Sequence, residues 1–353
     1  MTPVELSRTV LGAVRRAVDA GELRVDVPER AVVAPPGPGG TGDYATNIAL
    51  QLSRPAGQPP LRVAELLRPH LVGADGITGV EITGPGFLNI RLDQNVGTAL
   101  VRRILDEGAA RYGHSDALAG QVYVLRVPYE VRAEVVADVL ARMVASQGAR
   151  VEIQQQKQQE QQTLQRDDTH ETLDVRPVPA PRDPAPRDPA PQDPTSLGTD
   201  AARWALLHPA PSDRPRITAD HLVQREGNPL FRVRYAHART RAVVRNAADL
   251  GFTPEPGAAE PRTPLLPLLT DYPRILTTAA PPTRPDAIAA PARLARHLVA
   301  VADAVLDLLP ATLPRGDEKP TAAHRARLAL AEAAGTVLAG GLSLLGIDAP
   351  DHL

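Results

Sequence analysis

Cysteine is absent from this chain of 353 residues, so the chain forms neither a disulfide nor a thiolate metal site. Its nine histidines are scattered without the spacing of metal ligands, and we expect no bound metal. No stretch approaches the roughly 18 consecutive apolar residues of a membrane span, and the N-terminus lacks the pattern of a signal peptide. We therefore expect a cytoplasmic protein that does not enter a membrane.

Lysine is almost as scarce, since Lys157 and Lys319 are the only two, and arginine therefore carries the positive charge. The formal net charge of -2 does not suggest a nucleic-acid binder. The charge is unevenly distributed, however. Between Arg203 and Asp249, nine arginines stand against four carboxylates, an excess of five positive charges.

Residues 1–118 show the mixed pattern of an α+β domain. Helix-start residues at Thr2 and Pro3, and a capping Asp43, combine with apolar residues at helical spacing. These signals predict helices over residues 2–21, 45–52 and 61–71. From Gly79 to Leu92 the apolar period changes to two, which predicts two strands around a glycine-proline turn.

Residues 119–153 hold one predicted strand, Val122 to Val127, and one predicted helix, Glu130 to Gln147. One strand and one helix are too little for a domain. Residues 154–196 are low in sequence complexity, with the run QQQKQQEQQTLQ followed by the repeat RDPAPRDPAPQDP. We expect this range to be a disordered Gln/Pro-rich linker, because the proline repeat cannot continue a helix.

Residues 197–353 carry patterns of nearly pure helix. The longest candidate runs from Asn228 to Leu250, and two more run from Leu294 to Leu308 and from Leu328 to Leu345. The sequence therefore predicts an α+β N-terminal domain and an all-α C-terminal helical bundle, joined by the strand-helix segment and the linker.

Two sets of polar residues are candidates for contact with RNA. Strand periodicity places Phe87, Asn89 and Arg91 on one face, where an aromatic ring can stack on a base, the amide can bond its edge, and the guanidinium can hold a phosphate. The alternative is that Phe87 packs under a loop and that the polar pair is merely solvated.

The second set lies on the long predicted helix, where Arg234, His237, Arg241 and Arg245 fall on one face. Cations spaced along a rigid helix can neutralise successive phosphates of a nucleic-acid backbone. A solvated helix face is the commoner explanation of such spacing. No nucleophile-base pair, metal-binding motif or paired carboxylates indicate a catalytic centre.

Three N-terminal motifs, Gly42–Leu50 (GDYATNIAL), Ser53–Gly57 (SRPAG) and Gly84–Asn89 (GPGFLN), resemble signatures of the arginyl-tRNA synthetase N-terminal domain. The resemblance implies a domain that grips the elbow of tRNA. It also implies that Phe87 and Asn89 help to recognise a base of the D-loop.

The C-terminal half carries a second set of matching motifs. Asp200–Arg203 (DAAR) resembles the DALR motif of the same family, with Ala202 in place of leucine. Asn228–Pro229 and Tyr235–Arg239 (YAHAR) match the next helix, and Arg327–Gly346 fits the last one. The resemblance implies an anticodon-binding bundle that contacts the anticodon stem and loop.

The middle of the chain departs from that family. Residues 119–153 resemble only the first strand and helix of its Rossmann catalytic domain and are interpreted as a remnant of it. The loop that would carry the HIGH-type motif is cut to Pro128-Tyr129-Glu130, and the carboxylate of Glu130 would repel a triphosphate. Neither lysine lies in a KMSKS-type context, so we expect neither ATP nor another cofactor.

The favoured interpretation is a catalytically inactive arginyl-tRNA synthetase-like protein that binds tRNA, with arginine tRNA as the first candidate, without charging it. One alternative is a protein-interaction module for a synthetase or a translation factor. Another is a residual arginine–tRNA ligase that acts with the active site of another chain. The resemblance and the two faces predict no catalytic residue and these tRNA-binding residues: Phe87, Asn89, Arg91, Arg234, Tyr235, His237, Arg239, Arg241 and Arg245.

Overall fold

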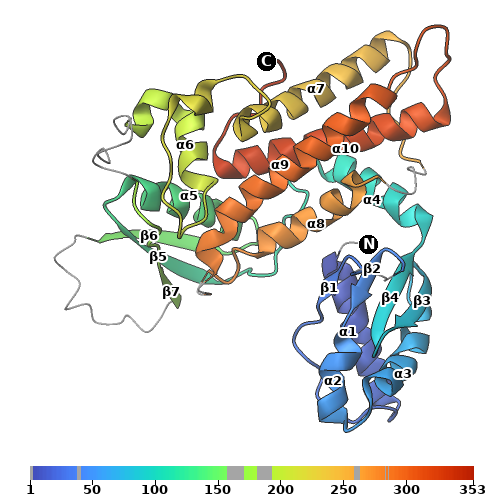
Figure 1. Cartoon of the computed structure of the whole chain (residues 1–353). Helices are drawn as coiled ribbons and strands as arrows, with labels where there is room; N and C mark the ends of the chain where they lie inside the picture. The colour runs from blue at the N-terminus through green and yellow to red at the C-terminus, as the bar shows by residue number, and fades with distance from the viewer. Residues whose placement is uncertain are drawn as a thin grey trace. The chain divides into compact units, whose positions relative to one another are not determined.

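The structure is a computed structural model that describes residues 3–37, 41–156, 171–180, 193–257, 263–282, 284 and 286–353 (Figure 1). It divides into two compact units, residues 1–100 and residues 101–353, which are called the first and the second unit below.

The first unit is an α+β fold built on a four-stranded antiparallel sheet in the order β1-β2-β4-β3. Apolar residues at helical spacing give each helix one buried side, and alternation gives each strand a buried face. Its elements are α1 (Pro3–Asp19), β1 (Val33–Ala34), β2 (Tyr44–Thr46), α2 (Ile48–Ala56), α3 (Pro60–Val72), β3 (Ile77–Thr83) and β4 (Phe87–Leu92). The predicted mixed class is confirmed.

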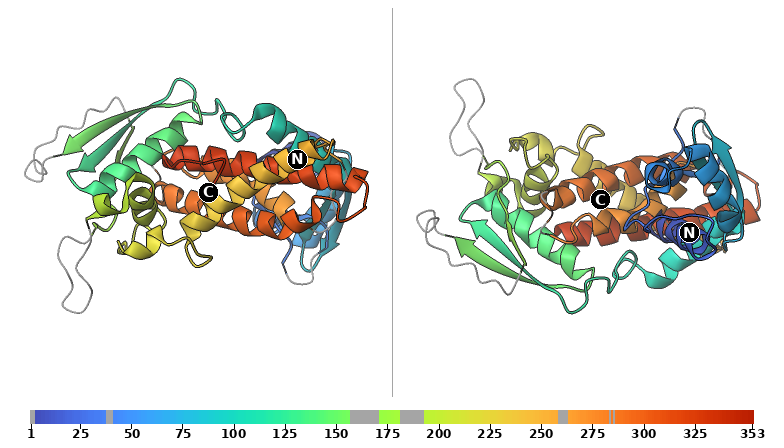
Figure 2. Two further views of the ribbon diagram at one scale, coloured as in Figure 1. Left: turned by 90° about the horizontal axis from the view of Figure 1, so that it is seen from above. Right: turned by 90° about the horizontal axis from the view of Figure 1, so that it is seen from below.

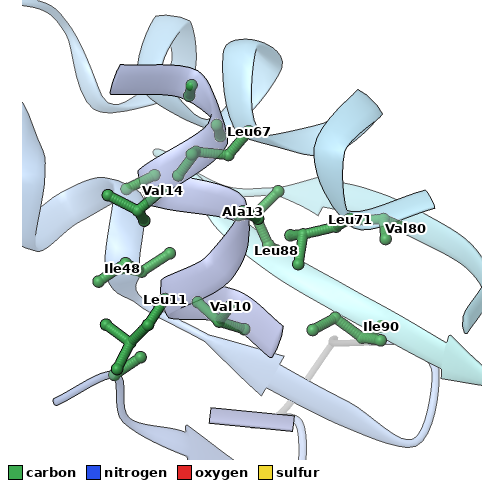
Figure 3. Close-up of a cluster of buried hydrophobic side chains, with 14 of the residues drawn as sticks. Val10, Leu11, Ala13, Val14, Ile48, Leu67, Leu71, Val80, Leu88 and Ile90 are labelled. Carbon is green, nitrogen blue, oxygen red and sulfur yellow. The ribbon is translucent and has the colours of Figure 1, made fainter. Parts of the chain in front are cut away.

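The core of the first unit joins helices α1 and α3 to strand β4 (Figure 3). Val10 of α1, Leu67 of α3, and Leu88 and Ile90 of β4 are all almost completely buried in it. Because Leu88 and Ile90 point into this core, the alternate residues of β4 lie on the opposite face of the sheet.

The start of the second helix differs from the prediction. Residues 44–46 form strand β2, paired with β4, and α2 begins only at Ile48. The carboxylate of Asp43 accepts a hydrogen bond from the backbone N–H of Leu92 at 2.7 Å instead of capping a helix. Tyr44 and Thr46 are buried, so pairing with β4 outweighs the local capping signal.

The second unit begins with the predicted strand and helix, which are β5 (Val122–Pro128) and α5 (Val131–Ala145). Two further strands, β6 (Arg150–Gln156) and β7 (Glu171–Asp174), flank β5 in a parallel sheet of order β6-β5-β7. Helix α5 packs against β5 and β6. The strand and helix therefore belong to a βαβ unit with a third strand, which the sequence pattern did not predict.

The range predicted to be a disordered linker, residues 154–196, is partly folded. It includes the end of β6 and all of β7. Val175 follows β7, is completely buried and donates its N–H to the carbonyl of Arg126 at 2.9 Å. Val178 donates its N–H to the carbonyl of Pro211 at 2.8 Å. The prediction is wrong for these residues, because strand pairing and burial fix their backbone. Residues 157–170 and 181–192 lie outside the described residues.

The two units divide at residue 100, whereas the sequence suggested a boundary near residue 118. Helix α4 (Gln94–Glu107) runs across the division. Tyr112 stacks on Tyr272 with ring centroids 5.9 Å apart, and its hydroxyl donates to the carbonyl of Leu269 at 2.8 Å. Burial of this ring among helical residues explains why the segment after residue 100 belongs to the second unit.

The rest of the second unit is helical, as predicted. Helices α7, α9 and α10 lie side by side (Figure 2). Gly335 of α10 permits a close approach to α7, since a Cβ there would lie 3.2 Å from the Cβ of Thr240. The elements are η1 (Pro194–Leu197), α6 (Thr199–Leu207), η2 (Ala219–Leu222), α7 (Pro229–Asp249), α8 (Leu265–Thr277), η3 (Ala287–Ala289), α9 (Ala290–Leu308), η4 (Leu309–Ala311) and α10 (Ala322–Leu345).

Helix α10 is the one helix among the described residues that is long and apolar enough to cross a membrane by length and composition. Its most apolar window is 72% buried inside the protein. A mostly buried core helix of a globular bundle meets the same criteria, so this helix is weak evidence for a membrane span.

Candidate functional site

The open face of β4 presents one exposed aromatic ring. The side chain of Phe87 is 40% exposed at the start of the strand. The preceding Gly86 has a φ of 139°, and a Cβ there would lie 2.9 Å from the backbone of Pro60. The tight turn therefore requires glycine, and it fixes the position from which the ring of Phe87 projects.

The two polar residues of this face are held within the first unit. Asn89 is only 3% exposed and donates its side-chain N–H to the hydroxyl of Thr83 at 2.6 Å. Arg91 is exposed, but its guanidinium lies 3.2 Å from the carboxylate of Glu81. The neighbouring strand β3 therefore supplies a partner to each of them, and their contact with a base and a phosphate stays a prediction. The sequence could have indicated both partners, since they lie near β4 in the register of a hairpin.

The cationic face of α7 is also occupied by groups of the protein. Arg234 lies 3.5 Å from Asp200, and Arg241 lies 3.0 Å from Asp351. Arg245 donates to the carbonyl of Asp351 at 3.3 Å. The predicted spacing on one face is confirmed, and these arginines already have partners within the protein, so the phosphate track stays a prediction. The segment after α10 folds back over this face, which no helical pattern could indicate.

His237 lies buried on this face, under the segment that follows α10. It is 4% exposed, and its Nδ1 lies 3.0 Å from the carbonyl oxygen of Pro350. Burial lowers the pKa of His237, against the opposing effects of the Pro350 carbonyl and Asp351. Its predicted role as a charged phosphate contact is therefore not supported, whereas it is placed to anchor the segment that covers α7.

Two other predicted residues of α7 are accessible. Tyr235 is 38% exposed, and its ring stacks on that of Phe231 with centroids 5.5 Å apart. Arg239 is exposed one turn further along the helix. Next to this aromatic pair, a cavity of about 380 Å³ opens between the start of α6, η2 and α7, with Phe231, Arg234 and Leu353 among its lining residues.

The motif residue Arg203 has a structural position. Its side chain is 17% exposed, forms an ion pair with Asp138 of α5, and donates to the carbonyl of Leu345 at the end of α10 at 2.9 Å. Arg203 of the DAAR motif therefore joins α6 to α5 and α10. The motif places no group of Arg203 on the α7 face.

The carboxyl end of β5, where the sequence placed the shortened loop, is closed by the chain itself. Glu130 caps α5 by accepting a hydrogen bond from the N–H of Ala133 at 2.8 Å. Its other carboxylate oxygen accepts from the N–H of Ala180 at 3.0 Å. Residues 175–180 therefore lie against the N-terminus of α5.

Arg132 holds the same closure together, and sequence reasoning missed it. It is 1% exposed, and burial lowers its pKa while Glu130 and Asp213 oppose the shift. The guanidinium donates five hydrogen bonds of 2.6 to 3.2 Å to the backbone carbonyls of Val178, Leu206, Pro209, Ala210 and Asp213. No sequence signal separates this arginine from a solvated one, because its acceptors come from distant segments.

Within the described part of the chain, no group of three or more histidine or acidic residues is placed to hold a metal ion. The residues at the α5 edge are acceptors and donors that already bond one another. Among the described residues, the arrangement offers surfaces with exposed aromatic rings and arginines.

Comparison with known proteins matches one family model to each of the two units. Residues 5–92 match the family model of the arginyl tRNA synthetase N terminal domain, and residues 233–353 match that of the DALR anticodon binding domain. The arginine–tRNA ligases of Paenarthrobacter aurescens (strain TC1) and Renibacterium salmoninarum are 41% and 42% identical to this chain over 164 residues. Each alignment covers 43% of this chain and 30% of the relative.

Solved structures show the same fold. The arginyl-tRNA synthetase of Thermus thermophilus superposes with a TM-score of 0.67 at 14% identity, covering 100% of both chains. That of Plasmodium falciparum gives 0.64 at 8% identity, covering 99% of both chains. In the sequence comparison, by contrast, this chain spans about 30% of the length of the curated arginine–tRNA ligases that it matches. With the N-terminal and the anticodon-binding regions both matched, the chain belongs to the arginyl-tRNA synthetase family.

Proposed function

We propose that this chain binds tRNA through both units and does not itself aminoacylate it. The observation that carries the proposal is the order of its parts. Matches to an N-terminal synthetase domain and to an anticodon binding domain flank a sheet whose strand end is closed by the chain's own backbone. Arginine tRNA is the proposed partner, because the curated relatives are named arginine–tRNA ligases.

Each unit offers chemistry suited to RNA. The exposed rings of Phe87 and Tyr235 can stack on unpaired bases, which is a common basis of single-stranded RNA recognition. Arg239 and Arg241 are exposed on α7 and can contact phosphates. These features support binding by two surfaces of one chain to one tRNA, with a gain from effective concentration.

The closure of the α5 edge supports the inactive part of the proposal. Parallel α/β sheets bind nucleotides at the carboxyl ends of their strands, next to a helix N-terminus. Here that place is taken by the carboxylate of Glu130 and by residues 175–180. A triphosphate would meet a like charge and would have to displace the hydrogen bonds of Arg132. On this proposal, residues 119–153 are the remnant of a catalytic domain, and ATP does not bind.

Salt-dependent binding of the full chain to an arginine tRNA transcript tests this proposal. We expect tight binding that weakens steeply with salt and exceeds binding to an unrelated tRNA, because phosphate contacts release counterions. Failure to bind either tRNA at low salt would refute the tRNA-binding function.

The name of the relatives also fits a residual ligase that works with another chain. An arginine-dependent ATP–pyrophosphate exchange assay on the pure protein addresses that reading directly. We expect no exchange above background. Exchange that depends on arginine would refute the inactive part of the proposal while leaving tRNA binding intact.

A protein-interaction role is the remaining alternative, and one observation favours it. Tyr129 and Val131 are 55% and 44% exposed beside the start of α5, and clustered exposed apolar residues are typical of protein contacts. Reversing the charge at Arg239 and Arg241 separates the two readings. The double variant loses tRNA binding if α7 contacts RNA, whereas a protein partner that docks at α5 still binds.

A further inference from the structure

The segment after α10 has a defined path along α7. Gly346 ends α10 in the left-handed conformation, with a φ of 69°, and turns the chain back. Ile347 follows and is 3% exposed, which anchors the turn. Residues 348–353, called the strap below, then run beside α7, where Figure 1 shows the C-terminus.

The strap contacts first α6 and then α7. Asp348 donates its N–H to the carboxylate of Asp200 at 3.4 Å, and the Pro350 carbonyl meets His237 at 3.0 Å. Asp351 then accepts from Arg241 through its carboxylate at 3.0 Å and from Arg245 through its carbonyl at 3.3 Å.

The strap offers the arginines of α7 hydrogen-bond acceptors, as the phosphates of a nucleic-acid backbone would. A carboxylate and successive carbonyl oxygens take the place of phosphate oxygens as acceptors for arginine. The strap also carries negative charge at Asp348 and Asp351, so a phosphate approaching Arg241 is repelled until the strap moves.

The strap is held loosely enough to move. The side chains of Arg241 and Asp351 are 47% and 52% exposed, and an ion pair with such exposure contributes about 0 to 1 kcal/mol. Asp348 and His352 are exposed as well. On leaving α7 the strap loses the contact of its Pro350 carbonyl with buried His237, but the anchor at Ile347 lies before the strap, so the helices of the bundle stay packed.

We infer that the strap is an internal competitor for the nucleic-acid surface of α7, and that RNA binds there by displacing it. The inference rests on the proposed function, because it assumes that α7 contacts RNA. It adds a means of regulation, since any change that weakens the strap strengthens RNA binding.

The test compares two single-charge variants of the full chain. Asp351→Asn removes the carboxylate that faces Arg241. Asp307→Asn removes an exposed carboxylate on α9 and gives the same net charge without touching the strap. Binding to an arginine tRNA transcript is measured from 50 to 300 mM salt, and thermal melts confirm that both variants are folded.

We expect Asp351→Asn to bind about threefold to fivefold more tightly than the wild type, because up to roughly 1 kcal/mol of competing ion pair is lost. The slope of log K against log salt should steepen by up to about 0.7 to 0.9, because phosphate replaces an ion pair of Arg241 with Asp351 in the wild type but not in the variant. If both variants gain equally, or if Asp351→Asn changes nothing, the inference is overturned while tRNA binding stands. If neither the wild type nor any variant binds, the proposed function fails, and the inference fails with it.

A second measurement follows the strap itself. Because the chain has no cysteine, Ala349→Cys provides a single attachment site for an environment-sensitive fluorophore within the strap. Saturating tRNA should change its emission, whereas a label on Ala311→Cys in η4 should respond much less. An unchanged strap label at saturating tRNA shows that RNA binds without displacing the strap and overturns the inference.

Discussion

Arg132 and Arg241 both belong to helices of the second unit, yet their surroundings give them opposite roles. Arg132 is 1% exposed and donates to five backbone carbonyls, whereas Arg241 is half exposed and faces one carboxylate. A buried guanidinium is tolerated only when its donors are satisfied, but an exposed one keeps most of its hydration. Burial, and not residue type, therefore separates the arginine that holds the fold from the arginine that is available to a ligand.

Replacing Arg132, the buried one of these two arginines, should have the largest effect on stability. Arg132→Met leaves five carbonyls without their donor and releases residues 175–180 from α5. We expect a loss of about 3 to 5 kcal/mol in the free energy of unfolding, as for other broken buried polar networks. Urea unfolding of the full chain measures it.

Arg142→Met provides the matched control on the same helix. Arg142 is 45% exposed, and its partner Asp138 lies one turn away. We expect a change below about 1 kcal/mol. Equal losses in the two variants would show that burial does not set the role of these arginines.

His297 extends the comparison to a buried base that avoids charge. It lies 7% exposed beside Tyr272, with ring centroids 6.1 Å apart, and its Nε2 has no hydrogen-bond partner in the described part of the protein. Burial lowers the pKa of His297 to about 4, with Asp271 opposing the shift and Arg274 adding to it. The folded protein therefore keeps this ring neutral where the unfolded chain would protonate it.

Stability should consequently fall as the pH drops from 6.5 toward 4. Above pH 6.5 both states are neutral at this position, and below it the unfolded state alone gains a proton. At pH 5 the loss attributable to His297 should be about 2 kcal/mol relative to pH 7.5.

The variant His297→Phe isolates this contribution, because the other buried histidines titrate in both proteins. The difference in unfolding free energy between pH 7.5 and pH 5 should be smaller in the variant by that amount. An identical pH dependence would mean that His297 is not kept neutral by burial.

Local patterns predicted much of the fold, and tertiary partners account for what they missed. Helical spacing predicted α1, α3, α5, α7, α9 and α10, and strand alternation predicted β4. Strand β7 was missed because only pairing with β5 stabilises its four residues. Asp43 carries a capping signal, but the pairing of β2 with β4 overrides it.

In the candidate site too, local patterns predicted where residues lie but not which tertiary partners they contact. Residue type and spacing placed Phe87 on an exposed strand face and Arg241 on an exposed helix face, and the structure confirms both positions. The partners of these faces, such as Thr83 and Asp351, depend on register and on the path of the chain after α10. Cytoplasmic location and the absence of a cofactor stay predictions.

The smallest expected effect on stability belongs to Arg241, and it completes the comparison with Arg132. Arg241→Gln removes one half-exposed ion pair with Asp351, so the free energy of unfolding should change by less than about 1 kcal/mol. The same variant should weaken binding to an arginine tRNA transcript and reduce the salt slope by about 0.7 to 0.9, because one phosphate contact is lost. Replacing Arg132 should therefore change the free energy of unfolding strongly, whereas replacing Arg241 should change mainly the binding of tRNA. Both quantities are measured on one preparation of each variant. A loss of stability as large as that of Arg132→Met would assign Arg241 and the strap to the fold instead of to the RNA surface.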